Sequence, residues 1–344
     1  MSEPSLTRRA LVAAAAAATV TAQNRIRIAF LGASHSHGPD KVRICKDSPD
    51  WELAGVWERD PKAAAEYKAK GVTLLERDKI LEDRSIPVVA IESEVKPHEE
   101  LALMALEAGK HLHLEKPPSD NPEGLRKIVR AARDKKLMVQ IGYMWRHHPG
   151  MNAIIEAGRK GWLGDIFLVR GMMNTLITDR RWEWALFSGG QMFEQGCHLI
   201  DPMVRLMGRP HRVSSHLRHH GRYNDNLADN TAAIFDWPGA MGVITSTLLQ
   251  NNGGAHRMFE VEGSNGTAVL RPIEGPPRLE FDLVKAAGPY PSGRHEVPLA
   301  KFERYTGDFA ELAGCVRSGE SLSVTLDQDL DVQEALLRAS GMWT

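Results

Sequence analysis

The chain has 344 residues, of which 42% are hydrophobic and 25% are charged, as is typical of a globular protein of about two domains. Its 43 Lys and Arg residues nearly balance its 44 Asp and Glu residues, so the basic excess that nucleic-acid binding requires is absent. The three cysteines lie far apart without a Cys-x-x-Cys pair, which excludes a disulfide framework and a cysteine-rich structural zinc site. The longest apolar run is too short to span a bilayer comfortably, which excludes a polytopic membrane protein.

The first 22 residues have the pattern of an export signal. Arg8 and Arg9 precede a weakly apolar stretch that contains six consecutive alanines, 13–18, and ends in small residues at Ala22. This pattern predicts a twin-arginine signal peptide over 1–22, cleaved after Ala22, and hence a periplasmic protein with no stable membrane insertion. The alternative is a frayed alanine-rich helix at the N-terminus of a cytoplasmic protein.

Residues 23–145 predict a doubly wound α/β domain. Short apolar segments typical of buried strands alternate with helix patterns that open at proline or an Asx residue and close at glycine. The expected strands are 25–32, 51–57, 87–92, 111–115 and 137–143, and the expected helices are 60–70, 97–108 and 121–136. Strands separated by single helices must be parallel with right-handed crossovers, which indicates a Rossmann-type domain that binds a dinucleotide.

Residues 146–344 predict a second domain of different architecture. After a helix at about 151–160, β-rich segments are separated by Gly, Asn and Pro, with no helix between several of them. The expected strands are 165–172, 232–237, 241–249, 258–262 and 267–270, and a final helix is expected at about 329–340. We therefore expect an α+β domain with a large, mostly antiparallel open sheet that binds substrate and mediates oligomerisation.

The turn after the first strand is the first candidate functional element. A dinucleotide fold needs glycines here so that the backbone can approach the pyrophosphate, and Gly32 occupies the first such position. Ser34 and His37 stand where the second and third glycines are expected, which weakens the signal. Glu58, 26 residues after Gly32, is placed to bind the adenosine ribose and favours NAD, whereas Arg59 would tolerate NADP. The alternative is a structural turn and a surface acid.

Two further motifs carry groups suited to proton transfer. Lys116, in a Glu-Lys-Pro sequence at the carboxyl end of a strand, can hydrogen-bond a substrate hydroxyl or assist its deprotonation, unless it is a surface lysine in a turn. Glu194, His198 and Asp201 have helical spacing that places them on one face. That arrangement suits a general base oriented by acids. The alternatives are a ladder of ion pairs on a helix face and a metal site, for which the sequence shows no fourth partner.

Taken in order, these motifs resemble the glucose–fructose oxidoreductase / inositol dehydrogenase family (Gfo/Idh/MocA). The resemblance rests on the strand–glycine turn, the acidic second strand, Glu-Lys-Pro, and Gly-Gly followed by acid-x-Gly-x-His-x-x-Asp. Segments 97–98, 142–146 and 161–166 support it. It covers essentially the whole chain after the leader and implies an NAD(P)-dependent oxidoreductase of pyranoses, polyols or sugar derivatives.

The resemblance also implies roles for the candidate residues. Lys116 would contact both the nicotinamide region and the reacting hydroxyl, and His198 would take the hydroxyl proton while hydride moves to the nicotinamide. Glu194, where the family usually has Asp, would position or assist His198. The predicted cofactor contacts are Gly32, Ser34, His35, His37, Glu58, Arg59, Glu115 and Lys116. The predicted substrate contacts are His98, Tyr143, Arg146, Trp182 and Asp201.

We expect no metal site. The pairs His147-His148 and His219-His220 and the alternating His111 and His113 are more typical of solvated or hydrogen-bonded imidazoles, because no further ligands accompany them. Trp182 and the neighbouring Trp184 suit stacking on a sugar ring and, equally, packing at the domain interface.

Export would constrain how the cofactor is used. Free NAD(H) is scarce outside the cytoplasm, so we expect a tightly bound cofactor, NAD rather than NADP, that is reduced and reoxidised within one cycle. Simple or coupled oxidoreduction of a small-molecule sugar is the first expectation. Redox-neutral glycoside hydrolysis, epimerisation or dehydration is the second, and a noncatalytic sugar-binding protein is the third. The exposed sheet face predicts a homo-oligomer.

Overall fold

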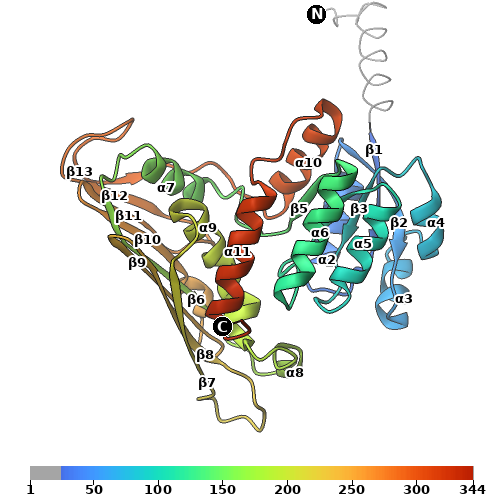
Figure 1. Ribbon diagram of the computed structural model, residues 1–344, viewed down its shortest axis with the longest axis horizontal. Coiled ribbons are helices and arrows are strands. Elements are labelled where there is room, and N and C mark those ends of the chain that lie inside the picture. Colours follow the sequence, from blue (N-terminus) through green and yellow to red (C-terminus); the bar gives the residue numbers. More distant parts are fainter. Residues whose placement is uncertain (1–24, 344) are drawn as a thin grey trace, which may run out of the picture.

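The chain folds into two sheets separated by helices (Figure 1). The structure is a computed structural model that describes residues 25–343, so the predicted signal peptide, 1–22, lies outside the described residues. Within the described part, no helix combines the length and the apolar character that a membrane span needs.

The first sheet is a five-stranded parallel sheet in the order β2-β1-β3-β4-β5, which confirms the predicted Rossmann-type architecture. Its apolar strands are buried on both faces, as parallel strands covered by helices must be. They are β1 (Ile26–Leu31), β2 (Trp51–Trp57), β3 (Val88–Ile91), β4 (His111–Leu114) and β5 (Val139–Ile141). The connecting helices are α2 (Gly38–Asp47), α3 (Pro61–Ala69), α4 (Arg77–Glu82), α5 (His98–Glu107) and α6 (Pro122–Lys135).

Proline and Asx residues start the helices of this domain as the sequence predicts. Asp60 accepts hydrogen bonds from the amides of residues 62 and 63 ahead of Pro61, and Asn121 does the same for residues 123 and 124 ahead of Pro122. Such caps satisfy amides that have no partner within the helix. They fix where α3 and α6 begin, and thereby the loops at the carboxyl edge of the sheet.

The second sheet has eight strands in the order β13-β12-β11-β10-β6-β9-β8-β7, and all of its pairs are antiparallel except β6 with β9. Its strands are β6 (Ile166–Asn174), β7 (Arg212–Arg218), β8 (Asn230–Trp237), β9 (Ala240–Thr247), β10 (Met258–Gly263), β11 (Gly266–Leu270), β12 (Leu279–Leu283) and β13 (Gly293–Val297). The helical segments that follow β5 in the chain are α7 (Pro149–Arg159), α8 (Arg181–Trp184), η1 (Met192–Gly196), α9 (Cys197–Met207), η2 (Gly253–His256), α10 (Thr306–Ser318) and α11 (Leu326–Ala339). This confirms the predicted mostly antiparallel sheet.

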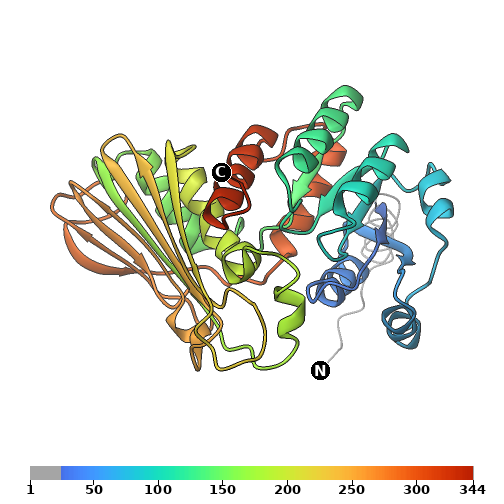
Figure 2. The same ribbon diagram turned by 60° about the horizontal axis from the view of Figure 1, so that its bottom comes forward.

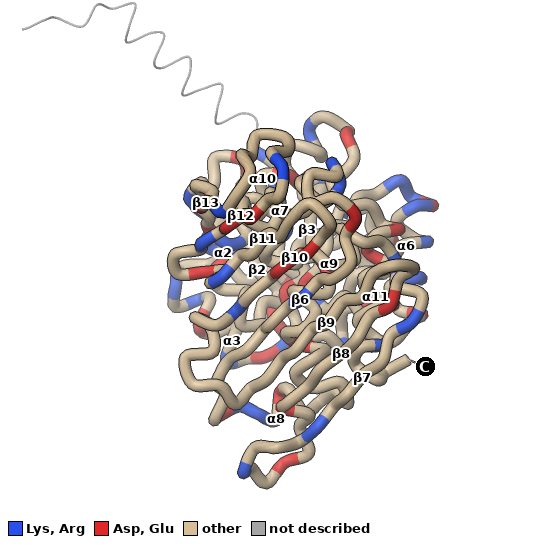
Figure 3. Tube along the Cα trace, turned by 90° about the vertical axis from the view of Figure 1, so that its left-hand side faces the viewer, with Lys and Arg blue, Asp and Glu red and all other residues tan. Residues whose placement is uncertain are grey.

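Helices cover one face of the large sheet and leave the other open. In Figures 1 and 2, α7, α9 and α11 lie on the side that faces the first domain. Figure 3 looks toward the opposite face, where acidic and basic residues are interspersed. Arg170 on β6, for example, bridges Glu260 and Glu262 on the neighbouring β10.

Helix α10 returns to the first domain, although the sequence assigns the whole of 146–344 to the second. Trp51 of β2 donates to the carbonyl of Phe309, and the Phe309 ring lies 4.6 Å from that of His113 on β4. The C-terminal segment therefore completes the core of the dinucleotide-binding fold on the face that α2 covers.

Several elements differ from the sequence-based expectation. Helices α2, α4 and α10 and strands β7, β12 and β13 are not predicted, because their apolar residues are few or interrupted by charged ones. The last helix starts at Leu326 instead of 329, because Thr325 and Gln328 form a capping box.

Candidate active site

The loop after β1 is shaped by close contact with β3. Gly32 has φ +82°, and a Cβ at this position would lie 2.7 Å from the Cβ of Ser93. Gly38, the first residue of α2, would place a Cβ 2.5 Å from the Ala33 carbonyl oxygen. Glycine is therefore required at both ends of the turn for steric reasons. Ser34 and His37 replace the second and third glycines of the usual pattern, and Gly38 follows directly after the third position.

This loop forms one wall of a cleft of about 1050 Å³ at the carboxyl edge of the first sheet. The predicted cofactor contacts Gly32, Ser34, His35, Glu58 and Arg59 all line it. Further lining residues that the sequence did not single out are Ser36, Trp57, Asp60, Pro97 and Leu101. Ligands bind at this edge in open α/β sheets, so the cleft has the position expected for a dinucleotide.

The cleft fits a dinucleotide chemically as well as by position. One oxygen of Glu58 accepts from the Ala33 amide at 2.6 Å and the other from the Asp60 amide at 2.9 Å, which fixes the carboxylate at the end of β2. The amides of Ser34 and Ser36 make no hydrogen bond to the described part of the chain. They are available to phosphate oxygens at the N-terminal side of α2, which has ten residues.

A smaller cavity of about 180 Å³ holds the three predicted catalytic residues, Lys116, Glu194 and His198. Lys116 comes from the end of β4, and the other two come from the segment that joins η1 to α9. The cavity and the cleft share His35, Ser36, Glu94, Arg180 and Glu183, so the two spaces adjoin.

The Glu194 segment is a π-helix rather than the α-helix that the predicted spacing assumes. A π turn contains an extra residue and is frequent at functional sites. Here the backbone carbonyl of Glu194 accepts from the ammonium of Lys116 at 3.1 Å, and the Glu194 carboxylate lies 3.8 Å from the same nitrogen. The π turn thus brings both the backbone carbonyl oxygen and the carboxylate of Glu194 close to Lys116.

The electrostatics of the cavity keep Lys116 charged and His198 neutral. Burial alone would lower the pKa of Lys116, but the neighbouring acidic groups, Cys197 and Glu194 foremost, outweigh it and raise that pKa. Burial and the positive charge of Lys116 lower the pKa of His198 well below its usual value. A neutral imidazole has a free nitrogen lone pair, as a general base requires.

Glu194 is the group that titrates near neutral pH. Burial raises the pKa of its carboxyl to about 7, and the attraction of Lys116 offsets only part of that effect. The Nδ1 atom of His198 is buried and has no hydrogen-bond partner among the described residues. Glu194 and Asp201, which the sequence predicts to orient this imidazole, therefore make no direct hydrogen bond to its Nδ1 atom.

Neither Glu115 nor His37, both predicted cofactor contacts, lines the cleft: His37 lines the cavity, and Glu115 lies buried beneath it. Glu115 is fully buried, and its Oε1 lies 3.0 Å from the Nδ1 atom of His37. Its second oxygen binds Lys41 of α2, which also lies 2.9 Å from the Glu92 carboxylate and 3.0 Å from the Nε2 atom of His113. A buried polar network thus connects the loop to β3 and β4.

Four of the five predicted substrate contacts lie behind the cavity wall. Both ring nitrogens of His98 lie 3.0 Å from backbone carbonyls, those of Pro117 and Ser93. Arg146 binds Asp201 at 2.7 Å in a buried ion pair, and its guanidinium lies 4.9 Å from the centre of the Tyr143 ring. His98, Tyr143, Arg146 and Asp201 therefore support the cavity without lining it.

The fifth predicted substrate contact, Trp182, lines the cleft and is 65% exposed, whereas Trp184 lines the cavity. The sequence also missed two arginines of the cavity wall. Arg257 precedes β10 and Arg304 precedes α10, and both pair with Glu274. Nothing in their local sequence distinguishes them from surface arginines, because the long-range fold alone brings them to the cavity.

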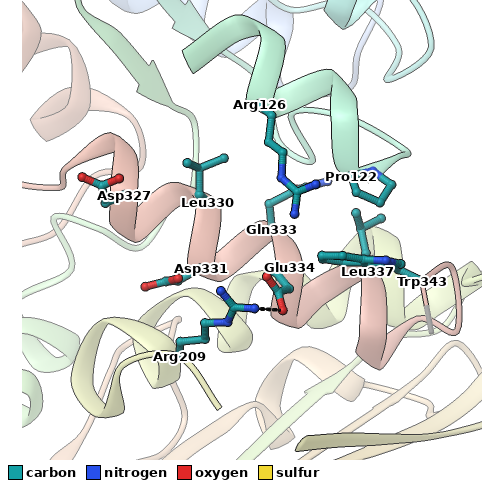
Figure 4. A pocket seen from close by; sticks show the side chains of 10 residues that line it. All are labelled: Pro122, Arg126, Arg209, Asp327, Leu330, Asp331, Gln333, Glu334, Leu337 and Trp343. Carbon is teal, nitrogen blue, oxygen red and sulfur yellow. Dashed lines mark hydrogen bonds and ion pairs between the residues drawn. The ribbon is translucent and has the colours of Figure 1, made fainter. Parts of the chain in front are cut away.

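A third hollow, of about 250 Å³, lies where α6 meets α11, remote from these residues (Figure 4). Its wall mixes charges of both signs, and Arg209 is paired with Glu334 across it. None of the predicted site residues lines it.

Comparison with known proteins agrees with the arrangement of the two domains. Residues 26–143 match the family described as "Oxidoreductase family, NAD-binding Rossmann fold", and residues 151–269 match "GFO/IDH/MocA C-terminal domain". The trans-1,2-dihydrobenzene-1,2-diol dehydrogenase of Bos taurus is 26% identical over 223 residues, which span 61% of this chain and 65% of that enzyme.

Solved structures of the same fold cover nearly the whole chain. An aldose–aldose oxidoreductase from Caulobacter crescentus superposes with a TM-score of 0.77 at 19% identity, covering 92% of this chain and 98% of that one. A protein of gentamicin A biosynthesis, in complex with NAD, superposes with a TM-score of 0.76 at 20% identity, covering 93% and 94%. At these identities the likeness establishes the fold. Together with the two family matches, it shows that the chain belongs to the Gfo/Idh/MocA family of NAD(P)-dependent oxidoreductases.

Proposed function

We propose that the protein oxidises a CH–OH group of a sugar, polyol or sugar derivative to a carbonyl, with NAD as the favoured cofactor. The observation that carries the proposal is that the dinucleotide cleft adjoins the cavity of Lys116, Glu194 and His198 and shares lining residues with it. When bound, the nicotinamide would supply the hydride acceptor at the junction of the two spaces.

Each of the three cavity residues has a role that its surroundings support. Lys116 is fixed by Glu194 and remains protonated, so it would donate a hydrogen bond to the reacting oxygen. His198, held neutral, would take the hydroxyl proton. Glu194, with a pKa of about 7, would hold or release a proton near physiological pH and tune both neighbours.

The cofactor preference rests on Glu58. Its carboxylate is fixed at the end of β2 and lines the cleft, where it would bind the ribose hydroxyls of NAD and repel a 2′-phosphate. Arg59 lines the cleft too and is the residue that would admit NADP.

The relatives support a substrate with several hydroxyl groups. The similar enzymes carry names that refer to a diol and to aldoses. The cavity wall agrees with this, because it is mostly polar and contains Arg257, Arg304 and Trp184, which suit hydroxyl groups and sugar rings.

A second candidate is a redox-neutral reaction in which a tightly bound cofactor oxidises the sugar transiently to allow glycoside cleavage, epimerisation or dehydration. The twin-arginine pattern at Arg8 and Arg9 favours it, because an exported enzyme has no external pool of NAD to draw on. We propose periplasmic export on that pattern, and a homo-oligomer formed through the open face of the large sheet.

The test is to purify the full chain, denature it, assay the supernatant for NAD(H) and NADP(H), and titrate each nucleotide into the stripped protein. We expect NAD to be released or bound more tightly than NADP. A panel of aldoses, polyols and glycosides then separates the candidates. Reduced nicotinamide that accumulates indicates net oxidation, and aglycone released without it indicates the redox-neutral reaction. Absence of any nucleotide binding would refute both.

A further inference from the structure

The structure gathers two imidazoles and a carboxylate that are far apart in sequence. His35 and His37 lie on the loop after β1, and Glu115 is the residue that follows β4. The Oε1 atom of Glu115 lies 3.0 Å from the Nδ1 atom of His37 and 3.7 Å from that of His35. The candidate ligand atoms of all three residues lie within 4.8 Å of one another. We propose that His35, His37 and Glu115 bind a first-row divalent cation, such as Zn²⁺ or Fe²⁺.

The spacing of the donors suits such a cation. Ligand bonds of about 2.0–2.2 Å in tetrahedral geometry place neighbouring donor atoms about 3.3–3.6 Å apart. The separations of 3.0 and 3.7 Å between Glu115 and the imidazoles bracket that range. The cation would replace the proton now shared between His37 and Glu115, and would displace the His37 amide from the Nδ1 atom of His35.

The donor set also suits such a cation. Two imidazoles and one carboxylate are ligand types that Zn²⁺ and Fe²⁺ bind in proteins.

Two lysines limit the charge that the site can accept. Lys41 binds the other oxygen of Glu115, and Lys116 lies 4.0 Å from Oε1. Each lysine also has a second carboxyl partner, Glu92 at 2.9 Å from Lys41 and Glu194 at 3.8 Å from Lys116, so neither depends on Glu115 alone.

The site would have open coordination positions toward the cavity. Within residues 25–343 the cluster offers three protein ligands, as in catalytic rather than structural metal sites. His35 and His37 line the cavity, with side chains 12% and 16% exposed, and the His37 ring lies 6.3 Å from the ring of His198. A hydroxyl or carbonyl oxygen bound to the cation would be polarised beside the proposed base. This proposal differs from the sequence-based expectation of no metal site, which did not bring His35, His37 and Glu115 together.

The test uses the full chain, freed of any affinity tag and treated with a chelator. Co²⁺ is titrated in, with visible absorbance and bound metal as readouts. We expect about one Co²⁺ per chain, displaced by Zn²⁺. His35→Gln and His37→Gln should each weaken binding at least about tenfold, and His216→Gln, an exposed histidine on β7, should not.

Two results would overturn the proposal: binding far below one ion per chain, or equal binding by the wild type and the His37→Gln variant. Circular dichroism of each variant checks that it is folded. NAD binding is measured on the same samples. A chain that binds NAD without Co²⁺ refutes the metal site alone, and one that binds Co²⁺ without any nucleotide refutes the proposed function alone.

Discussion

The ammonium group of Lys116 lies 3.1 Å from the backbone carbonyl oxygen of Glu194 and 3.8 Å from its carboxylate. The lysine belongs to the first domain and the glutamate to the second, so this contact joins the end of β4 to the π-helix η1 across the domain boundary. The relative positions of Lys116 and Glu194 in the cavity therefore depend on how the two domains pack against each other.

The first prediction concerns Lys116. Lys116→Met keeps most of the side-chain volume but removes the charge that would stabilise the reacting oxygen, so kcat should fall about 10²–10³-fold. NAD binding, measured by titration, should change far less. Lys301→Met removes an exposed lysine outside the cavity and should leave kcat unchanged. A Lys116→Met enzyme with full turnover would remove this residue from the mechanism.

The second prediction concerns pH. Glu194 has a pKa of about 7, whereas His198 titrates well below 6.5. If the carboxylate form of Glu194 assists His198, kcat/KM should rise with pH through about 7. In Glu194→Gln that inflection should disappear. The only remaining fall in kcat/KM should then occur at lower pH, where His198 becomes protonated. An inflection near pH 7 that persists in Glu194→Gln would have to come from another group.

The same carboxyl makes a separate prediction for stability. Its folded pKa of about 7 lies above its ordinary value of 4.5, so between these pH values the folded state holds a proton that the unfolded state has lost. The contribution of Glu194 to stability is therefore lost as pH rises from about 4.5 through about 7. Glu194→Gln should gain stability relative to the wild type across that window, as measured by denaturant unfolding. A constant difference between the two proteins would contradict the raised pKa.

The sequence predicts the Rossmann strands and the three cavity residues because those signals are local. Buried strands with Asx-Pro helix starts can be recognised in a single segment, and Lys116 follows a strand whose carboxyl end must lie at the binding edge. The prediction fails for residues whose positions depend on contacts between segments that are distant in the sequence. Arg257 and Arg304 reach the cavity from distant segments, and His98 and Arg146 are drawn into hydrogen bonds and ion pairs behind it.

The shape of the Glu194 segment was beyond sequence reasoning for a different reason. Glu194, His198 and Asp201 have the spacing of one α-helical face, but the π turn at Met192–Gly196 shifts the register. His198 lines the cavity, whereas Asp201 lies behind it with Arg146 and Arg205. No propensity of these residues marks a π turn, which depends on tertiary packing.

The fourth prediction concerns the choice of nucleotide. Glu58→Gln removes the negative charge at the end of β2 while keeping an oxygen that can accept from the Ala33 amide. NAD affinity should fall and NADP affinity rise, so that the ratio of their Kd values shifts by about tenfold or more. Glu82→Gln, an exposed acid of the same domain outside the cleft, serves as the control. An unchanged ratio would show that Glu58 supports the loop without contacting the ribose.

The fifth prediction concerns Lys41, which is fully buried and holds Glu92 and Glu115 together beneath the loop. Lys41→Met would leave the buried, ionised carboxylate of Glu115 without its ammonium partner, and breaking a buried ion pair in this way costs about 3–5 kcal/mol of unfolding free energy. Denaturant unfolding at neutral pH measures the loss. Lys46→Met, an exposed lysine of the same helix, should change stability by less than about 0.5 kcal/mol. A Lys41→Met protein as stable as the Lys46→Met control would show that this network contributes no net stability.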